Sequence, residues 1–363
     1  MARTEGETTR VNIHFDAGWE NALFLRGDCA PFSWEKGVTC TWTPGNIWTY
    51  EWEMHQPALE FKVLQNDSLW SAGSNYQIRR GETRHIYPFF KEGSGLLERF
   101  HYFDTPIIVY LPPGYEENAA RSYPVCYMHD GQNLFDPEAS FQGVAWDVHQ
   151  TISALVLSDL MEGIIAVGIF NRGVARIHDY TPSFDPSFGD EGAGGGADTY
   201  AKLVIEEIKP FIDERYRTKP GPANTGLLGS SLGGLVSLYM ARSRPDVFGK
   251  VASLSSSFWW NGQNLIRQIT HEREYVPIKI YLDSGGKESW RNTLEMYRAL
   301  IACGYEPGVD LTCGIAPSHS HTERCWAERL HLPLTFLFPP KVRATADLPE
   351  EQHKRSTAQV AVG

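Results

Sequence analysis

The stretch Thr225-Gly226-Leu227-Leu228-Gly229-Ser230-Ser231-Leu232-Gly233-Gly234 joins a short apolar run to a longer apolar segment that ends at Arg244. The run has the length of a buried strand, and the segment 232–244 has the length of a helix. Between them the pattern Gly-x-Ser-x-Gly places Ser231 on a sharp strand-to-helix turn, because glycines let strand and helix approach closely. The N–H groups that open the helix would stabilise a negatively charged oxygen there. Ser230 is out of register, so the stretch predicts Ser231 as a nucleophile; the alternative is a glycine-rich turn without chemistry.

On both sides of this stretch, apolar runs alternate with helical patterns. The strand candidates are residues 106–111, 125–128, 163–170, 225–228, 250–254, 278–282 and 309–314. The helix candidates are residues 146–160, 200–216, 232–244, 290–304 and 322–330. This alternation predicts an α/β fold, with a mostly parallel sheet and helices on both faces.

The N-terminal part of the chain has a different pattern. Short alternating runs, such as Val11-Asn12-Ile13-His14-Phe15, are separated by turn residues between positions 10 and 90. They predict a small all-β sandwich. We expect the sandwich in residues 1–95, the α/β domain in 96–340, and a disordered polar tail in 341–363. The loop 183–195 is rich in Gly, Asp and Ser, and we expect it to be mobile.

Composition excludes several classes of partner. The 363 residues carry a formal net charge of −11, whereas nucleic acids and anionic membranes select clustered Lys and Arg. No apolar run approaches the ~20 residues of a membrane span. The first ten residues contain no apolar core of a secretory signal, which favours a cytoplasmic protein. The oligomeric state stays open.

The six cysteines are scattered, which favours free thiols in a reducing compartment. Cys29 and Cys40 form the only local pair that a disulfide would suit. No His and Cys cluster has the spacing of a zinc site, so we expect no metal.

A serine nucleophile needs a base and an acid, and with this kind of turn they follow it in the order acid, then histidine. Glu288 and Asp283 both follow the strand candidate 278–282. Glu288 is the first choice for the acid and Asp283 the second, since Asp283 could instead cap the turn. His321, directly before a helix candidate, is preferred as the base over His319.

Two backbone N–H groups should bind the oxyanion that forms during such a reaction. One belongs to Leu232, the residue after the nucleophile. For the second we expect Gln132, or Gly131, on the loop after the strand candidate 125–128. His129 and Asp130 lie in the same loop, and we expect them to hold its shape rather than to catalyse.

Several motifs recur in one order and carry a family resemblance. They are Tyr127-Met128-His129-Asp130-Gly131-Gln132-Asn133, Asp179-Tyr180-Thr181-Pro182, Gly285-Gly286-Lys287-Glu288 and His321-Thr322-Glu323-Arg324-Cys325-Trp326. Residues 105–339 thereby resemble the esterase family of enterochelin, feruloyl and acetyl-xylan esterases and mycolyltransferases. The resemblance implies an α/β-hydrolase fold and supports Ser231, Glu288 and His321 as the triad. Gly286 and Thr322 depart from the family pattern, which usually has Thr and Asn there.

The N-terminal region resembles starch-binding carbohydrate modules more loosely. The pieces are Phe32-Ser33-Trp34, Glu60-Phe61-Lys62 and Trp70-Ser71-Ala72-Gly73-Ser74-Asn75. The resemblance implies that Trp34 and Trp70 stack on a sugar while Lys62 and Asn75 bond its hydroxyls. The alternative is that the tryptophans fill the core and the sandwich is only a lid.

These observations favour a serine esterase that needs no cofactor. Its substrate would be a small-molecule or glycan-linked ester, such as an acylated sugar or a siderophore-type lactone. An acyltransferase would use the same acyl-enzyme, with an alcohol in place of water. A glycan-binding protein with an inactive hydrolase domain is the remaining alternative, which an intact set of Ser, acid and His disfavours.

Overall fold

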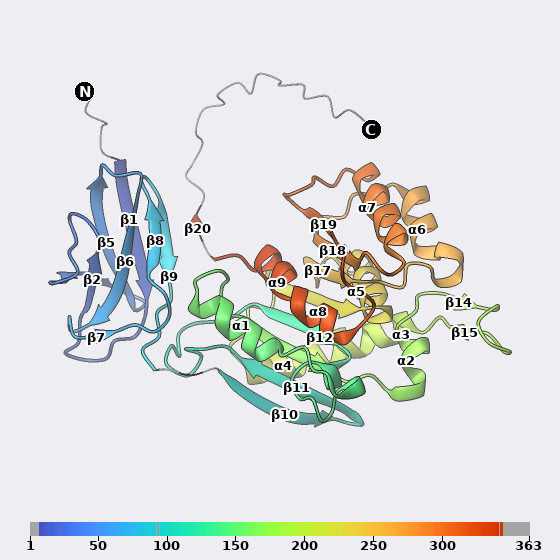
Figure 1. Cartoon of the computed structure of the whole chain (residues 1–363). Coiled ribbons are helices and arrows are strands. Elements are labelled where there is room, and N and C mark those ends of the chain that lie inside the picture. The colour runs from blue at the N-terminus through green and yellow to red at the C-terminus, as the bar shows by residue number, and fades with distance from the viewer. Residues whose placement is uncertain (1–6, 92, 94, 341, 344–363) are drawn as a thin grey trace, which may run out of the picture.

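The computed structural model describes residues 7–91, 93, 95–340 and 342–343 (Figure 1). Its central sheet has eight strands in the order β10-β11-β13-β12-β16-β17-β18-β19. The strands are β10 (Leu96–Tyr102), β11 (Thr105–Leu111), β12 (Val125–His129), β13 (Ile165–Ile169), β16 (Thr225–Ser230), β17 (Lys250–Leu254), β18 (Lys279–Gly285) and β19 (Leu311–Ala316). The pairs along the order from β13 to β19 are parallel, whereas β10 pairs antiparallel with β11, and β11 pairs antiparallel with β13. The predicted mostly parallel sheet is confirmed.

Helices cover both faces of this sheet because its central strands are apolar on both sides. One core cluster contains side chains of α3 (Ala197–Lys202), α4 (Lys209–Arg215), α5 (Leu232–Ser243), α6 (Trp260–Glu272) and α7 (Trp290–Ala302). A second cluster, on the opposite face, contains those of α1 (Val148–Leu157), α8 (Glu323–Arg329) and α9 (His331–Leu337). The carboxyl ends of the parallel strands therefore meet at one edge between two helical layers.

Some elements differ from the sequence prediction. A π-helix, Leu203–Ile208, separates α3 from α4 within the single helix expected at 200–216. The loop 183–195 contains a two-stranded hairpin, β14 (Phe184–Asp185) and β15 (Ala193–Gly194). Helix α6 has no counterpart in the prediction. Its first turn has positive φ at residues 261–263, so a regular helical pattern of apolar residues begins only at Leu265.

The N-terminal region forms the expected sandwich of two sheets, shown in blue in Figure 1. One sheet has the order β20-β9-β1-β5-β4, and the other has β3-β2-β6-β7 with β8 also on β6. The strands are β1 (Glu7–His14), β2 (Leu23–Gly27), β3 (Val38–Thr39), β4 (Thr41–Thr43), β5 (Ile47–Met54), β6 (Ala58–Gln65), β7 (Leu69–Trp70), β8 (Tyr76–Arg79), β9 (Thr83–Ile86) and β20 (Val342–Arg343). Side chains from both sheets share one core.

Strand β20 corrects the expectation of a disordered tail from residue 341. Val342 and Arg343 pair antiparallel with Arg84 and Thr83 of β9, at the edge of the first sheet. Pairing at an edge uses backbone groups, so polar sequence without periodicity does not prevent it. Position 341 and residues 344–363 of the expected tail lie outside the described residues.

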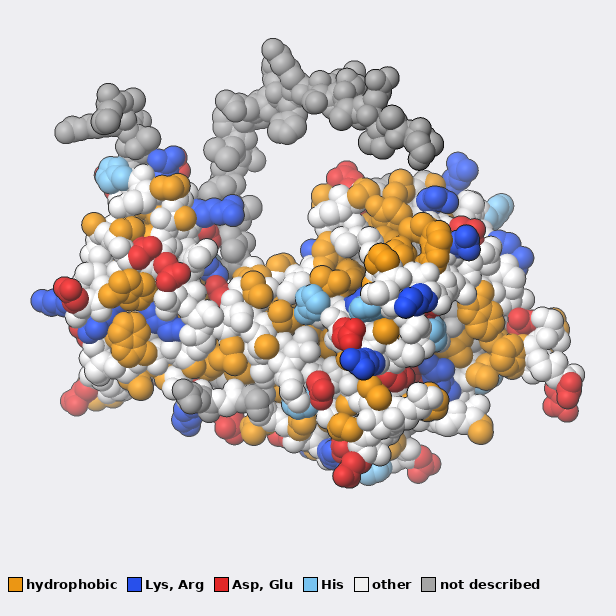
Figure 2. Space-filling model, viewed as in Figure 1, with side chains coloured by type: hydrophobic (Ala, Val, Ile, Leu, Met, Phe, Trp, Pro, Cys, Tyr) orange, Lys and Arg blue, Asp and Glu red, His pale blue; other side chains and the backbone are white. Residues whose placement is uncertain are grey.

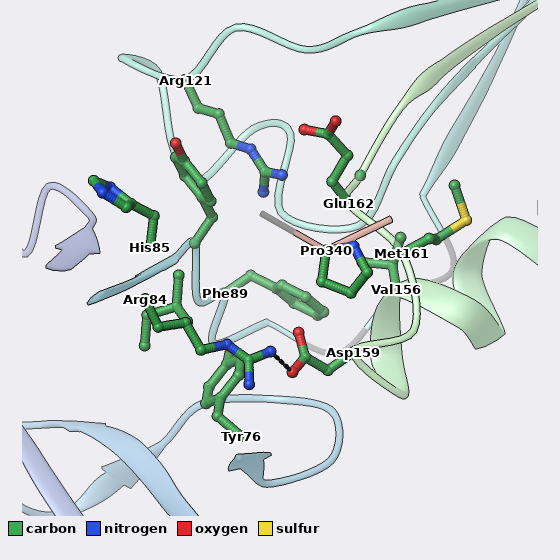
Figure 3. Close-up of a pocket in the computed structure, with 13 residues that line it drawn as sticks. Tyr76, Arg84, His85, Phe89, Arg121, Val156, Asp159, Met161, Glu162 and Pro340 are labelled. Atoms are coloured by element: carbon green, nitrogen blue, oxygen red, sulfur yellow. Dashed lines mark hydrogen bonds and ion pairs between the residues drawn. The ribbon is translucent and has the colours of Figure 1, made fainter. Parts of the chain in front are cut away.

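The sandwich packs against the α/β part of the chain beside α1. Ser74 donates its N–H to the Leu157 carbonyl at 2.6 Å. Arg84 of β9 forms an ion pair with Asp159, which follows α1, in the pocket between the two parts (Figure 3). None of the six cysteines forms a disulfide. No described helix combines the length and the apolar character needed to cross a bilayer.

Candidate active site

The turn between β16 and α5 holds Ser231 in an unusual backbone conformation. Its φ is 56° and its ψ is −123°, which is uncommon for a residue with a side chain. The flanking glycines explain how the turn closes: a Cβ on Gly229 would lie 2.5 Å from the backbone carbon of Gly233. The spacing of the glycines thus allows the close strand-to-helix approach that exposes the Ser231 hydroxyl.

Three predicted side chains meet in a hydrogen-bonded chain. The Ser231 Oγ lies 3.0 Å from Nε2 of His321, and the His321 Nδ1 lies 2.5 Å from Oε2 of Glu288. A carboxylate accepts hydrogen bonds, so the proton of the neutral imidazole belongs on Nδ1. Nε2 is then able to accept a proton from the serine hydroxyl. The ring of His321 is held edge-on against Trp326, at 4.9 Å between centroids.

The structure separates the two acid candidates. Burial raises the pKa of Glu288, but hydrogen bonds from His321, Ser255 and the Gly285 N–H outweigh it, and the pKa is lowered overall. Asp283 is buried and paired with Arg329, with Nε and Nη2 at 3.1 and 3.0 Å from its oxygens. Burial raises the pKa of Asp283 despite that partner. Glu288, the first choice, is therefore the acid that contacts the histidine.

His319 does not reach Ser231. Arg329 donates to its Nδ1 at 3.1 Å, and its Nε2 lies 3.4 Å from Glu328. With Cys325 and Glu328 it forms a trio whose ligand atoms lie within 4.8 Å of one another. Because Arg329 can only donate, Nδ1 must accept and Nε2 carries the proton. The imidazole would have to lose the Arg329 bond before Nε2 could bind a metal ion, so the trio does not suit one.

Backbone hydrogen bonds join the loop that carries the acid to the loop that carries the histidine. Gly286 N–H donates to the Ala316 carbonyl at 2.7 Å, and Lys287 N–H donates to the His319 carbonyl at 3.0 Å. A Cβ on Gly286 would lie 2.7 Å from the carbonyl oxygen of Pro317. Glycine is therefore required at the position where the resembling family usually has Thr.

The expected oxyanion loop lies against the start of α5. A Cβ on Gly233 would lie 3.2 Å from Oδ2 of Asp130, so loop and helix are in contact. Arg176 holds Asp130 through two hydrogen bonds of 2.7 and 2.8 Å. Gln132 is the middle residue of the short 3-10 turn Gly131–Asn133, and Leu232 is the first residue of α5. These positions agree with the expected N–H donors, whose roles stay predictions.

The expected supporting roles of His129 and Asp130 agree with their surroundings. His129 is buried and its Nδ1 lies 2.8 Å from the Tyr200 hydroxyl. Burial, together with the charge of Arg176, outweighs the attraction of Asp130 and lowers the pKa of His129 to about 4. A histidine that stays neutral and enclosed in this way supports the loop and is not placed to exchange protons with a substrate.

Four residues of the site were not predicted. Ser257 donates its N–H to the Ser231 carbonyl at 3.0 Å, and its hydroxyl lies 3.2 Å from the Ser231 Oγ. Ser255 and Arg329 contact the acid and its neighbours. Glu323 accepts hydrogen bonds from Asn133 and Trp146, which joins α8 to the oxyanion loop. The run of serines directly after β17 was the sequence feature that could have indicated Ser255 and Ser257. Strand β17 lies beside β16 in the sheet, so the residues after it lie close to Ser231.

The surface around α8 carries His, acidic and basic side chains together (Figure 2). Two large apolar side chains are exposed, Trp259 at 44 % and, on the β14–β15 hairpin bonded to Asn261, Phe184 at 54 %. Trp259 comes two residues after Ser257, and Trp260 anchors the hairpin through its indole N–H, 2.9 Å from the Ser183 carbonyl. An exposed aromatic surface therefore lies close in the chain to the residues that contact Ser231.

Of the expected sugar-binding residues, Lys62 is buried and the other three are on the surface. Trp34 and Trp70 are 37 % and 42 % exposed, and their rings stack at 6.3 Å between centroids. Asn75 donates to Glu60 at 2.7 Å on the surface. Lys62 is buried, and its amine donates to the carbonyls of Ala72, Gly73 and Ser74. The expected role of Lys62 is therefore wrong, because its amine has no hydrogen left for a ligand.

Comparisons with known proteins indicate the family of the chain. A family model described as "Putative esterase" matches residues 103–306. The chain is 30 % identical over 154 residues to the Bacillus subtilis protein YbbA, covering 42 % of this chain and 56 % of YbbA. It is 31 % identical over 109 residues to the siderophore enterobactin esterase of Emericella nidulans, covering 28 % of this chain and 35 % of that protein. The match thus spans about half or less of these curated relatives.

The enterobactin esterase of Shigella flexneri, solved in the presence of enterobactin, has the same fold. It superposes with a TM-score of 0.54 at 14 % identity, over 87 % of each chain. The predicted α/β-hydrolase fold with an N-terminal β-rich region is confirmed.

Proposed function

The chain belongs to this family of esterases, and from that premise we propose that it is a serine esterase acting through Ser231, His321 and Glu288. The observation that supports the proposal best is the hydrogen-bonded chain from the Ser231 hydroxyl through the imidazole to a buried carboxylate. This arrangement is the one that activates a serine hydroxyl for attack on an acyl carbon.

In the proposed reaction the Ser231 oxygen attacks the ester carbonyl carbon while Nε2 of His321 takes the hydroxyl proton. The N–H groups of Leu232 and Gln132 would bind the resulting oxyanion. Nε2 then gives its proton to the leaving alcohol, and an acyl-enzyme remains. A water molecule, deprotonated by the same nitrogen, releases the acid. An alcohol in place of water would make the protein an acyltransferase, which a product assay with added alcohols distinguishes.

For the substrate we propose a siderophore-type lactone or an acylated sugar that carries an aromatic ring. The exposed indole of Trp259 offers such a ring a flat face. Relatives of the chain include a siderophore enterobactin esterase and an endo-1,4-beta-xylanase/feruloyl esterase. Hydrolysis of enterobactin, feruloyl sugars and acetyl sugars, measured side by side, would identify the preferred class.

The function is tested by replacing the nucleophile. Ser231→Ala should lower kcat by roughly 10⁴-fold or more, because the triad acts as a unit. Ser230→Ala, the matched control one residue earlier in β16, should keep most of the activity. A fluorophosphonate should label the wild-type protein and Ser230→Ala, but not Ser231→Ala. Equal labelling of all three proteins would contradict the proposal.

A second candidate function belongs to the sandwich, where the stacked and exposed Trp34 and Trp70 favour sugar binding. We propose weak binding of an α-glucan, on the order of millimolar. Trp34→Ala and Trp70→Ala should each abolish retention on an amylose column. Trp42 is also exposed but lies on the other sheet, so Trp42→Ala should be retained like the wild type. Failure of the wild type to bind amylose would leave the sandwich without this role.

A further inference from the structure

A buried serine lies directly behind the acid of the triad. Ser255 follows β17 with a φ of 43° and is only 4 % exposed. Its Oγ has three partners: Oε1 of Glu288 at 2.6 Å, the Trp326 Nε1 at 2.9 Å and the Arg329 Nη2 at 3.0 Å. The position therefore connects the acid with two side chains of α8.

Only one arrangement of hydrogens satisfies these three contacts. A hydroxyl has one proton to donate and two lone pairs that accept. The indole N–H of Trp326 and the guanidinium of Arg329 can only donate, so they occupy both lone pairs. The Ser255 proton must then point to Glu288.

This direction favours the ionised form of the acid. Oε1 of Glu288 accepts from the Ser255 hydroxyl and also from the Gly285 N–H. An oxygen that receives two donors has no room for a proton of its own. Oε2 faces Nδ1 of His321, and the hydrogen bonds to Glu288 lower its pKa despite burial, so the carboxylate is ionised and the imidazole proton lies on Nδ1. Nε2 is thereby left free to accept the proton of Ser231.

The guanidinium of Arg329 is fixed by hydrogen bonds from all of its nitrogens. Its Nε and Nη2 bond the two oxygens of the buried Asp283, and Nη2 also bonds Ser255. Its Nη1 bonds Nδ1 of His319 and the Cys325 carbonyl. All five N–H groups therefore have acceptors. The ion pair of two almost fully buried side chains keeps the guanidinium directed at Ser255.

We propose that Ser255 is a positioning residue of this esterase, directed by the Asp283–Arg329 ion pair, which holds Glu288 ionised and bonded to His321. The inference rests on the proposed role of Glu288 as the acid of the triad. Ser255 does not touch Ser231 or the reacting atoms, so it acts only through the carboxylate.

The test is Ser255→Ala, assayed on the hydrolysed ester. Its kcat should fall about 10- to 100-fold, since hydrogen bonds to charged groups contribute on that scale. KM should stay nearly constant, because the hydroxyl is remote from the substrate. Ser153→Ala is the matched control: that buried hydroxyl on α1 lies 2.7 Å from the hydroxyl of Tyr110 on β11. It should keep the wild-type kcat.

A second readout separates positioning from general loss of stability. The proton shared by His321 Nδ1 and Glu288 should give a proton NMR signal far downfield of the backbone amides, absent in His321→Ala. On acidification the signal is lost when Glu288 is protonated. Burial raises the pKa of Glu288, and the bond from Ser255 is one of those that lower it. In Ser255→Ala the signal should therefore disappear at a higher pH than in the wild type or in Ser153→Ala.

Ser255→Cys covers the case in which the alanine variant does not fold. Its thiol is a weaker donor of similar shape, so kcat should fall by less than in Ser255→Ala. Wild-type kcat and an unchanged signal in either folded variant would overturn the proposal. The proposed function fails separately, when the wild-type protein is neither labelled by the fluorophosphonate at Ser231 nor able to hydrolyse an ester.

Discussion

His129 at the end of β12 illustrates a burial effect at the scale of one residue. Its Nε2 has no hydrogen-bond partner among the described residues, while its Nδ1 meets the Tyr200 hydroxyl. A protonated ring would place a charge in this enclosed site, so burial lowers the pKa of His129 in the folded protein to about 4. The unfolded chain takes up the proton near its ordinary value of 6.5.

This difference predicts a loss of stability on the acidic side. The free energy of unfolding is not affected by protonation of His129 above pH 6.5. It decreases as the pH falls from 6.5 towards 4, because only the unfolded state gains a proton in that window. The maximum loss is about 3 kcal/mol at about 1.4 kcal/mol per pKa unit. The free energy of unfolding is measured in urea at pH 7 and at about pH 4.5, within that window. Between these two pH values, His129→Phe should lose less stability than the wild type. His101→Phe, an exposed control on β10, should match the wild type, and an equal loss in all three would contradict the prediction.

The sequence predicts the nucleophile and the base because their order along the chain and their places beside a helix are local features. It ranks Glu288 above Asp283 but does not decide between them, since both come after the same strand candidate, 278–282. The deciding residue, Arg329, lies 46 positions after Asp283 and neutralises it. Lys62 is a similar case. A sugar-binding pattern and a buried lysine that bonds three carbonyls look alike in sequence, because these carbonyls belong to a loop 10 to 12 positions later in the chain.

At the scale of elements, the contact between the acid loop and the histidine loop depends on Gly286. Gly286→Ala would place a Cβ 2.7 Å from the Pro317 carbonyl oxygen and separate the loops. A displacement of about 1 Å in a catalytic group costs roughly 100-fold, so kcat/KM should fall on that scale. Gly221→Ala is the control, because nothing lies within 4 Å of its Cβ. Steady-state kinetics would contradict the prediction if both variants matched the wild type.

Elements with a regular apolar pattern were predicted well, and elements defined by long-range contacts were not. The strands β11, β12, β13, β16, β17 and β18 and the helix α5 follow from runs of buried residues. The edge strand β10 alternates less clearly because it is exposed on much of its surface. The π-helix between α3 and α4 shifts the helical register, which no periodicity within 200–216 reveals.

At the scale of the whole molecule, the ion pair of Arg84 with Asp159 joins the sandwich to the hydrolase part (Figure 3). Arg84→Met should lower the free energy of unfolding by about 2 kcal/mol, because it leaves a partly buried carboxylate without its partner. The double variant Arg84→Met/Asp159→Leu should recover part of that loss. Arg244→Met, which breaks an exposed pair with Asp246, should cause no measurable change. Additive losses in the Arg84/Asp159 cycle would show that the pair does not couple the two parts.

Sequence patterns distinguish the two parts of the chain but do not reveal how they are joined. Each part has its own period of apolar residues, which is visible locally. Their interface consists of single residues scattered over several elements, such as Ser74, Arg84 and Asp159. Such polar contacts carry no periodic signal, so only the folded structure reveals them.

Strand β20 has a consequence for how the chain tolerates cutting and rearrangement. The chain leaves the sandwich after β9, builds the hydrolase part, and returns to pair with that same β9. The sandwich is therefore connected to the hydrolase part at both ends of that part, by the chain between β9 and β10 and by the pairing of β20 with β9. A single proteolytic nick between β9 and β10 should leave two fragments that migrate together under native conditions. For the same reason the N-terminal part is not an independent module. Fusing residues 7–91 to another enzyme would leave the edge of β9 without its C-terminal partner strand.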